Sequence, residues 1–209
     1  KNTIEEIVLR DDGSVWLATP VGLEVRHADG SVEEIDRISG TDISGITGLA
    51  EDDGGNLWIS SGNSFEGSFR WDGDGWRHFG VSDGLPPERI HKIRRDRRGR
   101  LWFLGMSGTP RRLDPGATTP SEPGAYVYED GVFTRWGVQE GLVDGRVYAF
   151  AEGPDGSLWF GTWGGLSRWR DGDWRHWTRT DGLERDRVFT LAVDEGGRVW
   201  FGDEASGLG

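Results

Sequence analysis

The chain has 209 residues, with 12 Trp, 35 Gly, no Cys and a net charge of −12. The lack of Cys excludes a disulfide scaffold and a Cys-ligated metal site, and the acidic balance argues against a nucleic-acid binder. The glycine content argues against a helical protein, because each interior Gly costs a helix about 1 kcal/mol. No apolar run approaches the ~18 residues of a membrane span. Because the sequence opens at Lys1 without a signal-like segment, we expect a processed product or a fragment.

An internal repeat organises the whole sequence. A Trp preceded by Leu or Val recurs at spacings of 42, 44, 57 and 41 residues, with an aliphatic residue always twelve positions earlier. The repeated Trp residues are Trp16, Trp58, Trp102, Trp159 and Trp200. The aliphatic residues are Ile4, Ile46, Ile90, Val147 and Val188. Self-similarity at a fixed period is typical of repeat folds.

Each unit predicts two β-hairpins. In the second unit an apolar segment at 46–49 is followed by the Asp/Gly turn 52–55 and a second apolar segment at 57–59. Such turns favour hairpins because Gly accepts positive φ. A second hairpin turns at 72–75, and four short antiparallel strands per ~42 residues are typical of a β-propeller blade. The segment 101–104 is apolar on both faces, so it must be covered on both sides.

We therefore expect an all-β protein, a β-propeller of four-stranded antiparallel blades in a single domain over residues 1–209. The expected blades are residues 1–42, 43–86, 87–143 and 144–184, with a partial blade at 185–209. An insertion loop is expected at 106–125 and a shorter insertion at 62–67. The units amount to about four and a half blades, so we expect either further sequence after Gly209 or another chain that completes the last blade.

Two stretches carry a resemblance to a known family. Residues 147–169 read VYAFAEGPDGSLWFGTWGGLSRW, and residues 188–208 read VFTLAVDEGGRVWFGDEASGL. Both resemble the two-component regulator propeller repeat. The resemblance implies a periplasmic or extracellular bacterial propeller, often the sensing part of a hybrid histidine kinase. Such a repeat specifies architecture better than activity.

One Trp stands outside the repeat. Eleven of the 12 Trp occupy repeated positions, where we expect them to pack between blades. Trp163 instead lies between glycines in the loop 161–165. That loop belongs to the propeller face that usually binds ligands. Trp163 is therefore a candidate for stacking on a ligand or anchoring a partner, and the alternative is local packing.

Three arginines precede the first strand of successive units, namely Arg89, Arg146 and Arg187. Repeat symmetry places them on one arc of that same face. One interpretation is a positive collar for an anionic ligand. The alternative is a structural role in which they pair with acidic residues of the preceding turns. Those acidic residues are Asp83, Glu140 and Asp181.

A basic run reverses the sign of charge locally. We interpret it as a docking patch for an acidic protein partner or for anionic lipid headgroups, and the alternative is a solvated blade edge. It lacks the aromatic platform that single-stranded nucleic acid would need. Its members are Lys92, Arg94, Arg95, Arg97, Arg98, Arg100, Arg111 and Arg112.

The sequence contains no catalytic or metal-binding motif. His78 and His176 occupy equivalent positions, which indicates a structural role, and no His pair has metal-ligand spacing. Calcium-loop, phosphate-loop and nucleophile-elbow motifs are also lacking. We therefore expect no metal, no cofactor and no enzymatic activity.

The predicted function is a non-catalytic, extracytoplasmic β-propeller that senses a small-molecule ligand or recognises a protein partner, periplasmic or extracellular and peripheral to a membrane. The alternative is a structural accessory subunit that docks onto a larger membrane-associated complex. A propeller lyase or hydrolase is the least favoured hypothesis, since it would need unrepeated acid, base or metal-ligating residues at the axis.

Overall fold

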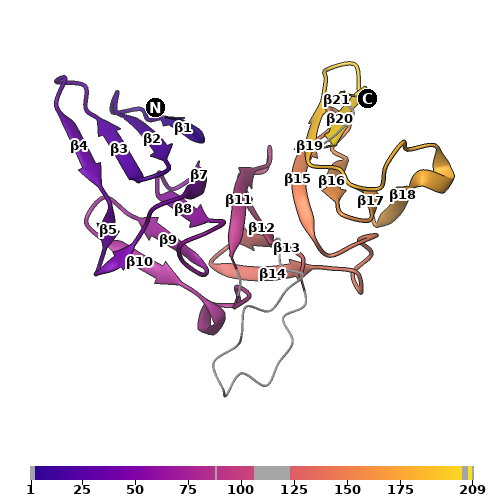
Figure 1. Ribbon diagram of the computed structural model, residues 1–209, viewed down its shortest axis with the longest axis horizontal. Coiled ribbons are helices and arrows are strands. Elements are labelled where there is room, and N and C mark those ends of the chain that lie inside the picture. The colour runs from indigo at the N-terminus through magenta and orange to yellow at the C-terminus, as the bar shows by residue number, and fades with distance from the viewer. Residues whose placement is uncertain (1–2, 88, 106–122, 204–206, 209) are drawn as a thin grey trace.

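The structure is a computed structural model that describes residues 3–87, 89–105, 123–203 and 207–208. Four antiparallel sheets of four strands follow one another along the chain (Figure 1), and within each sheet the strands pair in sequence order. This meander confirms the predicted blade. The strands are β1 (Glu6–Leu9), β2 (Val15–Thr19), β3 (Gly22–Arg26) and β4 (Val32–Ile35); β7 (Ile46–Glu51), β8 (Leu57–Ser61), β9 (Ser68–Trp71) and β10 (Trp76–Phe79); β11 (Ile90–Arg95), β12 (Leu101–Gly105), β13 (Ala125–Glu129) and β14 (Val132–Trp136); β15 (Val147–Glu152), β16 (Leu158–Thr162), β17 (Gly165–Arg170) and β18 (Asp173–Trp177).

A fifth, smaller sheet and a short hairpin complete the described strands. The fifth sheet has three strands, β19 (Thr190–Val193), β20 (Val199–Asp203) and β21 (Gly207–Leu208). The hairpin of β5 (Arg37–Ile38) and β6 (Thr41–Asp42) lies between the first two sheets, and the repeat pattern did not predict it. The described residues contain two 3-10 turns, η1 (Val81–Asp83) and η2 (Arg179–Asp181), and no α-helix.

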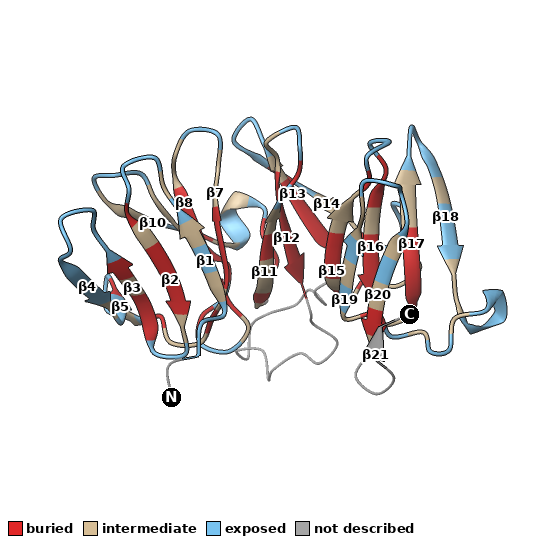
Figure 2. Cartoon of the chain, turned by 90° about the horizontal axis from the view of Figure 1, so that it is seen from above, coloured by how far each residue is buried: buried red, intermediate tan, exposed pale blue. Residues whose placement is uncertain are grey.

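The sheets stand side by side in an arc (Figures 1 and 2). The first strand of each sheet contacts the first strand of the next, from β1 through β7, β11 and β15 to β19. This is the radial arrangement of a β-propeller, with four complete sheets and a partial fifth, as the repeat predicted. Residues 62–67 connect β8 to β9 as the predicted shorter insertion. Most of the predicted loop at 106–125 lies outside the described residues.

Aromatic side chains fill the space between neighbouring sheets. Trp58 on β8 and Trp102 on β12 are fully buried. The Trp58 ring lies 5.4 Å from Phe103 of the third sheet, and Trp102 stacks at 5.0 Å on Phe150 of the fourth. Burial is concentrated on middle strands such as β2 and β12, while the outer strands β4 and β18 are largely exposed (Figure 2). Trp200 on β20, in the last sheet, is 45% exposed.

The indole N–H of each of the five repeated Trp residues has its own acceptor. In three units the acceptor is an Asp six residues before the Trp, at 2.8, 2.9 and 3.2 Å; in the other two it is a Ser two residues before, at 3.2 and 2.9 Å. An unpaired buried donor would cost about 1–3 kcal/mol, which explains why Asp and Ser recur in these turns. The acceptors are Asp52, Asp96, Asp194, Ser14 and Ser157.

Three of the first strands contain the same irregularity. Pairing between β7 and β8, between β11 and β12 and between β15 and β16 skips one residue, so a bulge interrupts each ladder near its start. The skipped residues are Thr47, His91 and Tyr148. No helix in the described part of the chain has the length and apolar character to span a membrane.

Candidate functional site

The bulges position a set of side chains at one end of the inner strands. A β-bulge turns its extra residue away from the regular alternation of the strand and is frequent beside functional sites. In the fifth unit Phe189 follows the repeated Val188, as Thr47, His91 and Tyr148 follow their aliphatic residues. We call these four residues, Thr47, His91, Tyr148 and Phe189, the bulge arc.

The rings of the bulge arc contact one another from sheet to sheet. The ring centroid of Tyr148 lies 5.8 Å from that of His91 and 4.6 Å from that of Phe189. Trp163 lies beside them, with its ring 6.0 Å from Tyr148 and 6.2 Å from Phe189. Residues of the third, fourth and fifth sheets thus form one aromatic cluster.

A rigid two-residue turn holds Trp163, which occupies the loop between β16 and β17 as predicted. Its backbone N–H donates to the Arg146 carbonyl at 3.1 Å, and the Thr162 hydroxyl closes the turn by donating to the Gly165 carbonyl at 2.7 Å. Gly165 is required because its φ is +140° and a Cβ there would lie 2.5 Å from the Trp177 carbonyl oxygen. The Trp163 side chain is half-buried, so its ring packs locally and is also reachable from solvent.

Two of the three predicted collar arginines meet at the Trp163 ring. The guanidinium carbon of Arg187 lies 3.7 Å from the ring centroid and that of Arg146 lies 5.0 Å away. Arg146 also donates twice to the Asp144 carboxylate, at 3.0 and 2.6 Å. These hydrogen bonds raise the pKa of Arg146 above its ordinary value. Arg187 is exposed and stacked on the indole.

The predicted acidic partners of the collar are occupied elsewhere, so that alternative is wrong in detail. Each of these carboxylates closes its own turn by accepting from the backbone N–H three residues earlier, and two of them also pair with an arginine of the preceding strand. The observed contacts are Asp83 with Arg77, Glu140 with Arg135, and Asp181 with the Thr178 hydroxyl.

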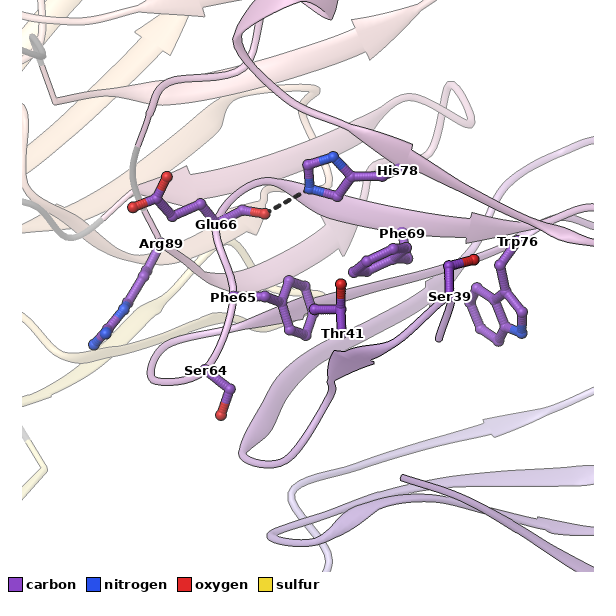
Figure 3. Close-up of a pocket in the computed structure, with 9 residues that line it drawn as sticks. All are labelled: Ser39, Thr41, Ser64, Phe65, Glu66, Phe69, Trp76, His78 and Arg89. Carbon is purple, nitrogen blue, oxygen red and sulfur yellow. Dashed lines mark hydrogen bonds between the residues drawn. The ribbon is translucent and has the colours of Figure 1, made fainter. Parts of the chain in front are cut away.

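Arg89 lies apart from the other two, in a separate cleft of about 540 Å³ (Figure 3). Its guanidinium donates to the Gly62 carbonyl at 3.4 Å. As Figure 3 shows, Arg89 and Glu66 lie at one end of the lining, and Phe69 and Trp76 lie at the other. The full lining consists of Ser39, Thr41, Ser64, Phe65, Glu66, Phe69, Trp76, His78 and Arg89.

His91 is a neutral member of the bulge arc. The pKa of His91 is lowered to about 4, mainly by burial and also by the neighbouring Lys92 and Arg94, although hydrogen bonds with the Leu104 and Tyr148 backbone act in the opposite direction. Nδ1 donates to the Leu104 carbonyl at 3.3 Å, since a carbonyl oxygen can only accept. The ring is therefore uncharged at neutral pH.

Four arginines of the basic run make contacts within the propeller, three of them between sheets. Arg94 pairs with Glu6 of the first sheet at 2.7 Å, and Arg95 pairs with Asp53 of the second. Arg100 pairs with Asp96 at 2.7 Å, beside the indole of Trp102. Arg97 faces the fourth sheet, where its side chain donates to the Gly153 carbonyl. Burial lowers the pKa of Lys92, and Arg98 is exposed. Arg111 and Arg112 lie outside the described residues.

The repeat pattern alone did not predict the bulge arc as a site. A usable signal was present: the residue after the repeated aliphatic one changes from Thr to His, Tyr and Phe, while the residue before it is always Ile or Val. The described residues contain no group of three His, Asp or Glu side chains arranged to hold a metal ion.

Comparison with known proteins supports the family resemblance of the repeat. Residues 141–164 match the family model of the two component regulator propeller. The matched segment includes Arg146, Tyr148 and Trp163, so this part of the chain is a two component regulator propeller repeat. None of the curated proteins compared with the chain matches it.

Solved structures show the same fold at low sequence identity. The extracellular domain of a protein named as a hybrid two component system from B. thetaiotaomicron is 17% identical, with a TM-score of 0.77 over 99% of this chain and 27% of that one. Virginiamycin B lyase from Staphylococcus aureus is also 17% identical, with a TM-score of 0.65 over 93% of this chain and 61% of the lyase. PorZ, a surface component of the type-IX secretion system of Porphyromonas gingivalis, is 17% identical, with a TM-score of 0.64 over 98% of this chain and 32% of PorZ.

These neighbours establish the β-propeller fold. The chain spans only 27%, 61% and 32% of the lengths of the three proteins. One of them is a domain of a signalling system, one is an enzyme and one belongs to a secretion system. A shared propeller therefore leaves the function to be argued from the site.

Proposed function

We propose that this chain is a non-catalytic recognition domain of an extracytoplasmic sensor, and that it binds a small-molecule ligand at the bulge arc and Trp163. The observation that carries the proposal is the half-buried Trp163 ring, held in a rigid turn with Arg146 and Arg187 against it and Tyr148 and Phe189 beside it. Aromatic and guanidinium groups fixed at one surface are typical of recognition sites.

The chemistry of the site supports binding over catalysis. The Asp144 carboxylate accepts both side-chain hydrogen bonds of Arg146 and the Arg146 backbone N–H, so its oxygens are already engaged. His91 has a pKa of about 4, which makes it a weak base at neutral pH. The repeat matched at 141–164 and the likeness to an extracellular domain support a periplasmic or extracellular location.

The test is a ligand-observed NMR screen of the wild-type chain against a small set of aromatic carboxylates, aromatic amines and neutral aromatic amides. We expect compounds that bind the wild type to lose binding in Trp163→Ala. The matched control is Trp200→Ala, which removes a solvent-accessible Trp of the repeat from a different position in the fold. Compounds that bind Trp163→Ala as well as the wild type would contradict the proposed site.

The accessory-subunit hypothesis remains the second proposal. It was based on the insertion loop at 106–125 and on the basic run. Three arginines of that run pair with carboxylates of the propeller itself, which leaves less charge for a partner. The likeness to PorZ supports it only through the fold. Stoichiometric co-purification of the native protein with a membrane complex would favour this function over ligand sensing.

A further inference from the structure

We propose that the site at Trp163 binds a monovalent carboxylate attached to a planar apolar group, with Arg187 as the residue that takes the carboxylate. The inference rests on the proposed function, because it names the ligand class of the same site. Three observations carry it: the stacking of Arg187, the charge balance around it and the aromatic rings beside it.

Stacking prepares Arg187 to bind an anion. Its guanidinium lies 3.7 Å from the Trp163 ring centroid, close enough for contact through the flat face of the group. The five N–H donors of a guanidinium lie in its plane, so face-on stacking leaves them free to make a two-pronged contact with a carboxylate. Among the described residues, Arg187 has no carboxylate partner, although it is exposed in a strongly acidic chain.

The local charge favours a monoanion over a dianion. Arg146 is already neutralised by Asp144, through hydrogen bonds of 3.0 and 2.6 Å. Arg185, two residues before Arg187, pairs with Asp203 at 3.4 Å. One unneutralised cation therefore remains at the Trp163 ring. A single bidentate arginine matches one carboxylate, whereas a phosphate dianion would keep an uncompensated charge.

The rings beside Trp163 select the rest of the ligand. Tyr148 and Phe189 are half-buried and lie edge to face at 4.6 Å, so part of their surface meets solvent beside Trp163, on which Arg187 stacks. A planar apolar group placed there removes aromatic surface from water and makes ring contacts. A ligand with a carboxylate at one end and a flat apolar body at the other uses both features together.

A purely structural role is the competing explanation, in which Arg187 only covers Trp163. If Arg187 binds the ligand, affinity depends on the charge of the ligand, whereas a purely structural Arg187 gives no such dependence. The probes are 3-phenylpropionate, its uncharged amide 3-phenylpropionamide, and phenyl phosphate, each titrated into the wild type and variants by NMR. The variants are Arg187→Gln, Arg187→Lys and the control Arg175→Gln, which removes an exposed arginine of β18.

We expect the wild type to bind 3-phenylpropionate about tenfold or more tightly than the amide, since charge-assisted bidentate hydrogen bonds are the strong ones. Arg187→Gln should abolish that difference, Arg187→Lys should retain only part of it, and Arg175→Gln should leave it unchanged. Phenyl phosphate should bind no more tightly than the carboxylate.

Several outcomes would overturn the proposal. Equal affinity for acid and amide in the wild type, or an unchanged preference in Arg187→Gln, removes the role of Arg187. If Trp163→Ala abolishes binding of both the acid and the amide, while Arg187→Gln binds both as the wild type does, the proposed recognition site stands and the carboxylate assignment fails. If phenyl phosphate binds more tightly than 3-phenylpropionate, the ligand class is a phosphate ester and not a carboxylate. Failure of all three probes to bind the wild type at millimolar concentration refutes the carboxylate class, whereas the recognition site is judged by the wider screen.

Discussion

Asp96 shows how one buried carboxylate serves several groups. It accepts from the Trp102 indole at 2.9 Å and from the Arg100 side chain at 2.7 Å, and it also caps its own hairpin turn through backbone N–H groups. It is 5% exposed. These contacts explain why Asp occurs six residues before the repeated Trp in three of the units.

The Asp96→Ala substitution should lower the free energy of unfolding by about 2–4 kcal/mol, because it leaves a buried indole N–H and a largely buried guanidinium without their acceptor. Chemical denaturation measures the effect. Asp194→Ala is the matched control, since Asp194 has the same partners in a more exposed unit. An equal loss in the two variants would contradict the importance of burial.

His91 gives the chain a pH-dependent stability. Its pKa in the folded state is about 4, whereas an unfolded His titrates near 6.5. Between these values the unfolded chain binds more protons than the folded one, so acid favours unfolding. The stability contributed by neutral His91 is complete above pH 6.5 and is lost as the pH falls towards 4.

We therefore expect the wild type to lose more stability than His91→Gln when urea unfolding is compared at pH 7 and pH 4.5. Gln cannot be protonated in this range and can still donate to the Leu104 carbonyl. If the two proteins lose the same stability between pH 7 and pH 4.5, protonation of His91 does not contribute to acid unfolding. His27→Gln provides the control, because His27 is exposed.

At the same scale, sequence reasoning selected Trp163 as a candidate and assigned the wrong acidic partners to the neighbouring arginines. Trp163 was found because it was the Trp that the repeat did not explain. The pairing of Arg146 with Glu140 was predicted from nearness in sequence, but the structure gives Glu140 to Arg135 and Asp144 to Arg146. Short ion pairs depend on strand register and side-chain direction, which a single repeat pattern does not specify.

The hairpins were predictable because their signals are local. An Asp/Gly turn between two apolar segments fixes a hairpin within about ten residues. The bulges at His91 and Tyr148 were not predictable in this way, because a bulge adds one residue to a pairing whose partner strand must already be known. The candidate site depends on those bulges, and this explains why the fold was predicted more completely than the site.

The turn that carries Trp163 offers a prediction for one element. Gly165→Ala should destabilise the chain by about 2–3 kcal/mol more than Gly172→Ala. Both positions have positive φ, at +140° and +92°, but a Cβ at Gly165 would lie 2.5 Å from the Trp177 carbonyl oxygen, whereas nothing lies within 4 Å of one at Gly172. Equal thermal shifts in the two variants would contradict this. The Trp163 indole resonance should also move in Gly165→Ala alone.

Charged residues connect the sheets into one molecule. Arg10 of the first sheet pairs with Glu51 of the second at 3.2 Å, and the backbone N–H of Arg97 donates to Glu152 of the fourth at 2.6 Å. Arg94 and Glu6 join the third sheet to the first at 2.7 Å, although 88 positions separate them in the sequence. The basic run that the sequence suggested as a docking patch therefore contributes to the cohesion of the propeller.

The Arg94–Glu6 pair allows a test of how much ion pairs between sheets stabilise the whole molecule. We expect Glu6→Gln and Arg94→Gln each to destabilise the chain by about 1 kcal/mol, with a coupling energy of similar size in the double variant, because both groups are partly buried. Raising the salt concentration should weaken the coupling only slightly, since partly buried pairs are less screened than exposed ones. The control cycle uses Arg26 and Glu24, a pair within β3 that connects no sheets and whose arginine is 61% exposed. Its coupling should be smaller and should disappear in high salt, and a coupling equal to that of Arg94 and Glu6 would show that contact between sheets adds nothing.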